Sequence, residues 1–448
     1  MTDTFTARNH GVTDTFTARN HGVTDTFTRR TRWAALLLAA ASLTLGLQPV
    51  LAVLTALAFG AALAGLVMPA VGFVGVGLLC VLDPVVRDQL FRGTPLPWNL
   101  INYFLLVVVA LSIPRLLRRR DSPGRLLEVL LLVLAAGLAW SLDRRLGLLH
   151  ILMALIYFGI LHYLLPLATS GEAWYRLGLV NGTVAAVGSG VYFLQRQSLA
   201  SIDANALSHF PLTGLLSCAL AYRFSRAAGS RARMLERLAA ANACWIFLSG
   251  SRGGLLVALF VMGWLLVQAP GRRARLALLG WTLLLGGVIV LAFHSEVNLE
   301  RSTAARYSLS QRTSGRSELA AAAWGLGLAH PFGIGTGSFP KTWAYRTSDP
   351  AWRGRYSPGL EKDAHSAWLK VFAENGFPGA LALLAFVGSF AAVGWRRRRR
   401  DPDALALGVL ASGAMALAFV TTQFQPKGIW LLAAGVAAVL DRAGRPGP

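Results

Sequence analysis

Long uncharged apolar runs constrain the fold of this chain more than any other feature. The runs LINYFLLVVVALSI at 100–113 and LALLGWTLLLGGVIVLAF at 276–293 are two examples. A helix needs roughly 20 apolar residues to cross the hydrocarbon core of a bilayer, and somewhat fewer for a short span. Because a backbone in lipid must satisfy its own hydrogen bonds, such runs predict transmembrane helices.

Similar runs fill most of the sequence. Only 14% of the residues are charged, against roughly a quarter in soluble domains. We expect spans near 33–47, 50–66, 69–83, 100–117, 126–142, 146–167, 177–195, 211–224, 238–251, 253–268, 276–293, 379–395, 404–420 and 429–440. Some of the shorter ones could be half-helices, so the sequence predicts an all-α polytopic membrane protein with about 12–14 transmembrane helices.

The net charge of +22 would suggest a nucleic-acid partner in a soluble protein, but its distribution argues against one. The arginine clusters IPRLLRRRDSPGR, YRFSRAAGSRARMLER, APGRRAR and WRRRRRD each lie between two apolar runs. Clusters of this kind mark the cytoplasmic side of a membrane protein, beside anionic lipid. The resulting alternation places both termini inside and four segments on the outer side, namely 84–99, 196–210, 294–378 and 421–428.

This alternation divides the chain into four parts. Residues 1–32, which read TDTFTARNHGV twice, predict a disordered cytoplasmic tail, and 33–293 predict an N-terminal transmembrane bundle. Residues 294–378 form a long outer loop, and 379–448 form the C-terminal transmembrane helices. Loops longer than about 15 residues tend to be functional. We expect this one to be partly helical, because SELAAAAWGLGLA and AHSAWLKVFAEN have helical composition.

Arginines on the outer side run against the topology rule and are the first candidates for a site. Arg252 lies in SGSRGGLL, while Arg306, Arg312 and Arg316 recur in RYSLSQRTSGRSELAAAAW, and Arg196 is a further outer-side basic residue. Glycines and a helix N-terminus let a backbone approach phosphate, and a guanidinium binds phosphate in a bidentate way. A phosphate clamp is the functional interpretation, and snorkelling or solvated arginines are the structural alternative.

The stretch DAHSAWLKVFAENGFPG at 363–379 places a titratable cluster directly before a predicted span. Neutral imidazole can accept a proton from a hydroxyl near pH 7, and a nearby carboxylate can orient it. His365 is therefore a candidate general base, with Glu361 and Asp363 as supporting residues, and a structural histidine is the alternative. The upstream HPFGIGTGSF at 330–339 predicts a tight turn, since no strand precedes it as in a dinucleotide-binding loop.

Two further patterns in the second half of the chain accompany these candidates. A Ser-Arg-Gly turn at 251–253 opens a span, and Leu256 completes Arg-x3-Leu. Arg316 then precedes an Ala/Trp helix and the Pro-x-Gly-x-Gly segment PFGIG. In this order they resemble the O-antigen ligase and polymerase superfamily, the Wzy C-terminal domain proteins.

The third motif points to the lipopolysaccharide O-antigen ligases within that superfamily. Their pattern is His, then Asn, Ser or Gln, nine residues, Gly, two residues and Gly. The chain reads His365-Ser366, nine residues, Gly376, two residues and Gly379. The first half of the chain matches in its pattern of spans alone.

This resemblance implies a membrane glycosyltransferase of the GT-C type. Such ligases move a polysaccharide from undecaprenyl pyrophosphate to a sugar hydroxyl of lipid A-core, on the periplasmic face of the bacterial inner membrane, without nucleotide sugar. We expect Arg252, Arg312 and Arg316 to hold the diphosphate and His365 to act as base in an inverting displacement. We expect no cofactor and no metal, because the outer-loop acids lack Asp-x-Asp spacing and the three cysteines lie in apolar runs.

Other functions remain open on the sequence alone. An O-antigen polymerase would use the same donor with a second lipid-linked glycan as acceptor, and a protein O-oligosaccharyltransferase would modify serine or threonine. A transporter predicts ionisable residues at mid-span and internal repeats, whereas the spans here are mostly apolar. Trp343, Tyr345 and Trp352 in the outer loop could stack on glycan or anchor the loop at the interface.

Overall fold

A computed structural model describes residues 47–64, 69–90, 100–116, 122–167, 171–195, 204–225, 229–249, 251–269, 316–349, 361–421 and 427–442, with Gly359 and a few positions between 271 and 287. Within these ranges the regular elements are α-helices and no strand is present. The predicted all-α class is therefore confirmed for the described residues. The predicted tail at 1–32 lies outside them.

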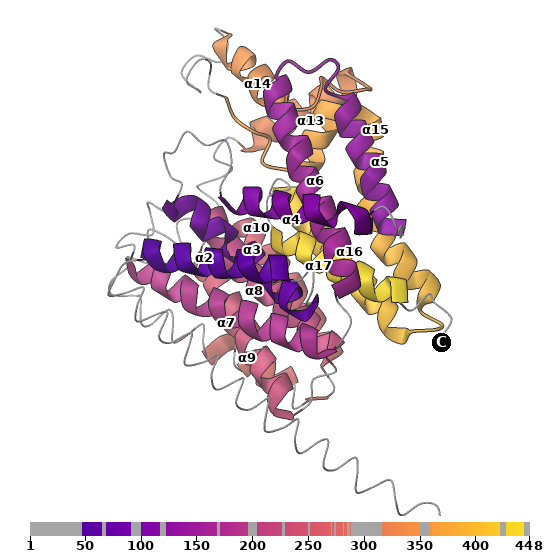
Figure 1. The fold of residues 1–448 in the computed structure, drawn as a ribbon. Helices are drawn as coiled ribbons and strands as arrows, with labels where there is room; N and C mark the ends of the chain where they lie inside the picture. The colour runs from indigo at the N-terminus through magenta and orange to yellow at the C-terminus, as the bar shows by residue number, and fades with distance from the viewer. Residues whose placement is uncertain are drawn as a thin grey trace, which may run out of the picture.

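The helices pack side by side (Figure 1). Buried apolar side chains from most of them form an extensive shared core. Their bounds are α2 (Leu47–Ala64), α3 (Pro69–Leu90), α4 (Leu100–Leu116), α5 (Ser122–Ala136), α6 (Arg144–Leu167), α7 (Gly171–Gln195), α8 (Ala204–Phe224), α9 (Gly229–Leu248), α10 (Arg252–Gln268), α13 (Arg316–Ala329), α14 (Phe339–Ser348), α15 (Ala367–Arg397), α16 (Pro402–Thr421) and α17 (Lys427–Arg442).

Helix α17 lies near the centre of this core, and Trp430 shows how it joins the two halves of the chain. Its ring stacks on Tyr157 of α6 with centroids 4.6 Å apart, and on Phe386 of α15 with centroids 5.7 Å apart. Phe419 of α16 adds a tilted contact at 6.0 Å. Aromatic groups bury large areas and fix ring geometry, so these contacts hold α6, α15, α16 and α17 together.

Two of the described helices have the length and composition of a membrane span. Ala367–Arg397 and Pro402–Val420 are long and apolar enough to cross a membrane, and Gln48–Ala64, Val71–Asp83, Gly253–Gln268 and Lys427–Ala437 are apolar but shorter. Large apolar side chains are also exposed on the outside of the bundle, including Leu132, Leu259, Val267, Leu381 and Leu384.

The long hydrophilic segment contains the two helical stretches that its composition predicts, since the alanine-rich run forms α13 and the run AHSAWLKVFAEN contains the start of α15. Helix α14, which comes after a set of turns at 330–338, was not predicted. Helices α13 and α14 share a small apolar cluster that includes Leu319, Phe339 and Trp343. They lie at the upper end of the molecule in Figure 1, beside the ends of α5, α6 and α15.

The boundary between the outer loop and the C-terminal helices is less sharp than the sequence suggests. Helix α15 starts at Ala367 and continues to Arg397, across a kink at Gly376. The predicted span at 379–395 is therefore the second part of a longer helix whose first part belongs to the predicted loop. The kink separates a short segment that carries polar residues from a long apolar one.

Contacts between helix ends show which parts of the chain meet. Trp264 of α10 donates from Nε1 to the carbonyl of Ala406 on α16 at 2.9 Å, and Phe260 packs on Gly413. Phe260, which precedes Trp264 on α10, contacts Gly413, which follows Ala406 on α16. The two helices are therefore antiparallel. The start of α10 consequently lies toward the C-terminal end of α16, where Ser366 donates to the carbonyl of Phe419 at 3.1 Å.

Two more contacts bring further helices to this end of the bundle. Lys427 at the start of α17 pairs with Asp83 of α3 at 2.6 Å. Gly254 lies so close to α8 that a Cβ there would come within 2.8 Å of the Cβ of Ser208. These helix ends adjoin the four segments that the arginine pattern places on the outer side.

Candidate functional site

His365 occupies an unusual backbone position directly before α15. Its φ is +53°, in the left-handed region that few residues other than glycine adopt, and its side chain is exposed. A conformation of this kind costs roughly 1–3 kcal/mol and persists where neighbouring structure enforces it, often at functional sites. Among the described non-glycine residues, the histidine of the third motif is thus the one with a left-handed backbone.

Ser366 fixes the residue that follows. It is the N-cap of α15, and its Oγ accepts a hydrogen bond from the amide of Leu369 at 3.5 Å. The same hydroxyl donates to the carbonyl of Phe419 on α16, and the residue is only 5% exposed. N-caps favour short polar side chains of this kind. The Ser position of the motif thus anchors the His365 turn to a neighbouring helix.

Lys370 and Asp363 fix the turn from its other side. The Lys370 ammonium lies 2.5 Å from Oδ2 of Asp363 and 3.2 Å from Nε2 of His150 on α6. Burial acts to raise the pKa of the Asp363 carboxyl. The charge and hydrogen bond of Lys370, with smaller contributions from His150 and the Ala364 amide, together outweigh burial and hold that pKa below its usual range. The Asp363 carboxylate thus pairs with Lys370, Glu361 is exposed, and a supporting role of either acid toward His365 stays a prediction.

Glu374 connects the same helix to α14. The residue is 2% exposed, and its carboxylate accepts hydrogen bonds from the amide of Phe339, at 3.1 Å, and from that of Gly337. Amides at a helix start lack intrahelical partners and attract negative charge. Glu374 therefore holds the first turn of α14 against α15. This contact was not predicted from the sequence.

The kink at Gly376 gives the glycine of the motif a physical reason. Its φ is +61°, and a Cβ at this position would come within 1.9 Å of the carbonyl oxygen of Pro331. Pro378 has no amide hydrogen, so the carbonyl of Glu374 instead accepts from the amide of Gly335 at 2.9 Å. The break in α15 is thus the place where the 330–338 turns bind.

Those turns also bind the connection between α5 and α6. The amide of Thr336 donates to the carbonyl of Gly137 at 3.1 Å, and Ser141 Oγ donates to the carbonyl of Thr336 at 2.7 Å. Gly335 has a φ of +99°, and a Cβ there would lie 2.6 Å from the Cα of Ser141. The tight turn expected in this glycine-rich stretch is confirmed, and it joins the two halves of the chain.

Asp143 completes that junction. Its Oδ1 accepts from the amide of Leu146 at 3.0 Å, which caps the start of α6, and its Oδ2 lies 3.2 Å from Lys341 on α14. Burial acts to raise the pKa of Asp143, but the hydrogen bonds from Leu146 and Lys341 hold it below its usual range. Lys341, an outer-side basic residue in the sequence, is therefore paired across the junction.

Of the candidate arginines, Arg252 and Arg316 lie at described helix starts. Arg252 is the first residue of α10, after the N-cap Ser251, whose Oγ accepts from the amide of Gly254 at 3.1 Å. Arg316 is likewise the first residue of α13. The expected helix starts are confirmed, but the side chains of these two arginines lie outside the described part of the structure, as do Arg196, Arg306 and Arg312 in full.

One expectation about the aromatic residues of the outer loop, that Trp343 could stack on a glycan, is wrong. Trp343 is 1% exposed and packs in the α13–α14 cluster, so it cannot stack on a glycan. Tyr345 is 72% exposed, and Trp352 lies outside the described residues. In the described ranges, no group of three or more His, Cys, Asp or Glu side chains is arranged to hold a metal ion.

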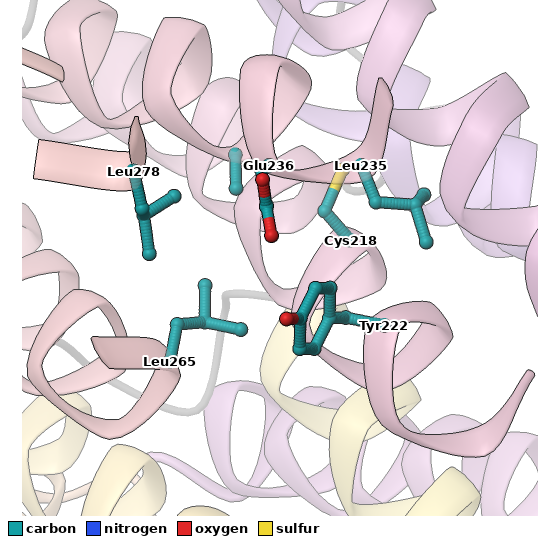
Figure 2. A pocket seen from close by; sticks show the side chains of 7 residues that line it. Cys218, Tyr222, Leu235, Glu236, Leu265 and Leu278 are labelled. Atoms are coloured by element: carbon teal, nitrogen blue, oxygen red, sulfur yellow. The ribbon is translucent and has the colours of Figure 1, made fainter. Parts of the chain in front are cut away.

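A separate pocket lies between α8, α9 and α10. It is lined by Cys218, Tyr222, Leu235, Glu236, Ala239, Leu265 and Leu278. Figure 2 shows the Glu236 carboxylate and the Tyr222 ring among apolar side chains. Tyr222 and Leu265 lie near the ends of α8 and α10 that are remote from Ser208 and Arg252. The pocket is therefore at the other end of these helices from His365.

Comparison with protein families gives a match over part of the chain. Residues 237–384 match the family model described as O-antigen ligase. The chain carries a domain of the O-antigen ligase superfamily. This domain contains Arg252, Arg316 and His365, together with the kink at Gly376. Comparison with curated proteins and with solved structures finds no match.

Important contacts of the O-antigen ligase domain come from outside it. Asp143 and His150, on the connection to α6 and on α6 itself, contact Lys341 and Lys370 inside the matched range. None of these contacts of Asp143, His150 and Lys370 was predicted from the sequence. One signal was available for Lys370, since a lysine within the apolar helical run AWLKVFA needs a buried partner.

Proposed function

We propose that this protein is a membrane-embedded O-antigen ligase of the GT-C type. It transfers a polysaccharide from undecaprenyl pyrophosphate to a sugar hydroxyl of lipid A-core. The O-antigen ligase domain supports the class of reaction, and the apolar helices support a membrane location. The observation that carries the proposal is His365, which has a left-handed backbone and an exposed side chain between two anchored residues.

His365 acts as the general base in this proposal. Its neutral imidazole accepts the proton of the acceptor hydroxyl while the hydroxyl oxygen attacks the anomeric carbon of the donor. A new glycosidic bond forms, the bond from that carbon to the pyrophosphate oxygen breaks, and undecaprenyl pyrophosphate leaves with the bonding electrons. One displacement inverts the anomeric carbon.

Arginines neutralise the leaving group. Arg252, Arg312 and Arg316 bind the diphosphate oxygens, whose negative charge grows as the bond breaks. The start of α10 lies toward the same end of α16 as the Ser366 anchor, which supports a shared site for Arg252 and His365. Free amides at that helix start add to the attraction for an anion.

The proposed orientation follows from charge and contacts together. Arginine clusters on the opposite ends of the spans favour the cytoplasmic side, so the His365 end faces the periplasm of a bacterial inner membrane. The contacts among Asp83, Lys427, Ser208 and Gly254 support one common outer end.

Complementation of a ligase-deficient strain tests the proposal. Wild-type protein should restore lipopolysaccharide ladders, and His365→Ala and Arg252→Ala should each lose them at equal membrane abundance. His330→Ala is the matched control, because this histidine is also exposed within the ligase domain but lies outside the motif. Normal ladders with His365→Ala would remove the base assignment. Single repeat units on the core in a strain that lacks this protein but retains a ligase would instead indicate a polymerase.

A further inference from the structure

Lys370 is a buried cation in a helix that is otherwise mainly apolar. The residue is 5% exposed, on the second turn of α15. A buried charge is costly unless it is paired, and removing its partner is more costly still. The Lys370 ammonium has Asp363 and His150 as partners, and Glu374 lies one turn further along the helix.

The contact with Asp363 spans the His365 turn. Asp363 precedes the histidine by two residues, and Lys370 follows it by five, so their ion pair closes a short loop around it. Asp363 Oδ1 also accepts from the amide of Ala364 at 2.8 Å, which fixes the first peptide of the loop. With Ser366 bound to α16, both neighbours of His365 are held.

The contact with His150 adds a partner from the other half of the chain. An ammonium offers donors only, so Nε2 of His150 accepts the hydrogen bond from Lys370. Helix α6 is itself held on α14 through Asp143 and Lys341. Lys370 is thus restrained by α6 and in turn restrains Asp363.

We infer that Lys370 is a positioning residue that holds His365 in its left-handed, reactive orientation through Asp363 and Ala364. This inference rests on the proposed function, in which His365 is the base. Without the ammonium, the Asp363 carboxylate turns toward solvent and the 363–366 loop relaxes. His365 then leaves the strained conformation, and its imidazole moves away from the acceptor hydroxyl. Displacement of a reacting group by about 1 Å can cost 100-fold in rate.

The first test compares two lysine variants with the same substitution. Lys370→Met should lower kcat by at least about 10-fold with the donor KM unchanged, since the diphosphate is held elsewhere. Lys427→Met is the matched control, because it also breaks a buried Lys–Asp pair, but one whose acid is Asp83 of α3 and not a residue of the 363–370 loop. It should keep kcat per folded molecule within about 3-fold of the wild type. Equal kcat losses in the two variants would overturn the inference.

A second readout follows His365 without requiring activity. The rate of carbethoxylation by diethyl pyrocarbonate is measured at fixed pH by mass spectrometry, with exposed His330 as internal control. Lys370→Met should change the His365 rate by at least about 3-fold, because the reactivity of an imidazole depends on its surroundings, and leave the His330 rate unchanged. An unchanged His365 rate would show that Lys370 does not position this residue. Because the readout is independent of transfer, it still decides the matter if His365→Ala proves active and the base assignment fails.

The double variant Asp363→Asn/Lys370→Met covers the case in which Lys370→Met does not fold. It leaves no unpaired charge at this pair and should fold more stably than Lys370→Met. The double variant still lacks the Asp363–Lys370 ion pair across the His365 turn. Its kcat and its His365 carbethoxylation rate should therefore stay at the values expected for Lys370→Met. Return of both to wild-type values would overturn the inference.

Discussion

Gly376 lies directly against the backbone of Pro331, and no residue with a Cβ fits at position 376. A Cβ at position 376 would come within 1.9 Å of the carbonyl oxygen of Pro331, and the φ of +61° adds strain for any side chain. We therefore expect Gly376→Ala to destabilise the protein by at least about 2 kcal/mol and to abolish transfer, because α15 can no longer bind the 330–338 turns. Thermal unfolding in detergent measures the loss.

Gly388→Ala is the control for this change. Gly388 lies on the same helix, and nothing lies within 4 Å of where its Cβ would be. Alanine favours a helix over glycine by up to about 1 kcal/mol, so the control should melt at or slightly above the wild-type temperature. If both variants melted alike, the contact with Pro331 would not be the cause.

The pair Asp83–Lys427 should be essential for stability but replaceable as a unit. The Lys427 side chain is 2% exposed and that of Asp83 is 10% exposed, at a separation of 2.6 Å. Lys427→Met should cost about 3–5 kcal/mol, because Asp83 is left charged and buried. Adding Asp83→Leu should recover most of this loss. Additive losses in the double variant, measured by melting, would contradict the account.

Ser366→Ala should affect both stability and transfer. The change removes the N-cap of α15 and the hydrogen bond to Phe419, at a cost of about 1 kcal/mol or somewhat more. Transfer per folded molecule should fall because the His365 turn loses one of its anchors. Ser389→Ala is the control, since its buried hydroxyl donates within the same helix to Phe386 at 2.6 Å and lies far from the turn. Full transfer by Ser366→Ala would count against the anchoring role.

Asp363 should contribute stability that depends on pH in a defined direction. Its pKa is held below the usual range by Lys370, so the folded state favours the charged carboxylate. The contribution is fully present above the unfolded pKa of about 3.9 and is lost as the pH falls through the lower folded value. The difference in melting temperature between wild type and Asp363→Asn should be constant from about pH 7 to 5 and shrink toward about pH 3.

The exposed Asp349 provides the comparison for that experiment. Asp349→Asn should melt close to the wild type at each pH, because no buried ion pair of the Asp363 kind is broken. A difference for Asp363→Asn that grew as the pH fell would mean that the carboxylate is not stabilised by Lys370.

The sequence predicted the helices well because their signals are local. Apolar runs and alanine-rich composition depend on neighbouring residues alone, and so α13 and the start of α15 lie where they were expected. The His365 motif also lies within one short stretch. Its left-handed φ was not predictable, because it depends on Asp363, Ser366 and their distant partners.

Long-range contacts explain what the sequence did not reveal. Asp143 and His150 are separated from Lys341 and Lys370 by about half of the chain, and a single sequence contains no information on such pairs. The suggestion that Trp343 stacks on a glycan was wrong for the same reason. An aromatic residue in a hydrophilic segment can face its own small core, and here it packs with α13 and α14.

An in vitro transfer reaction tests the central claim most directly. Purified protein is mixed with undecaprenyl-pyrophosphate-linked glycan and lipid A-core in the presence of EDTA. The account predicts a shifted lipopolysaccharide band with wild type and with His330→Ala, and no shift with His365→Ala. A shift that persists in His365→Ala, or longer lipid-linked glycan without any shift, would contradict the proposal that His365 makes this protein an O-antigen ligase.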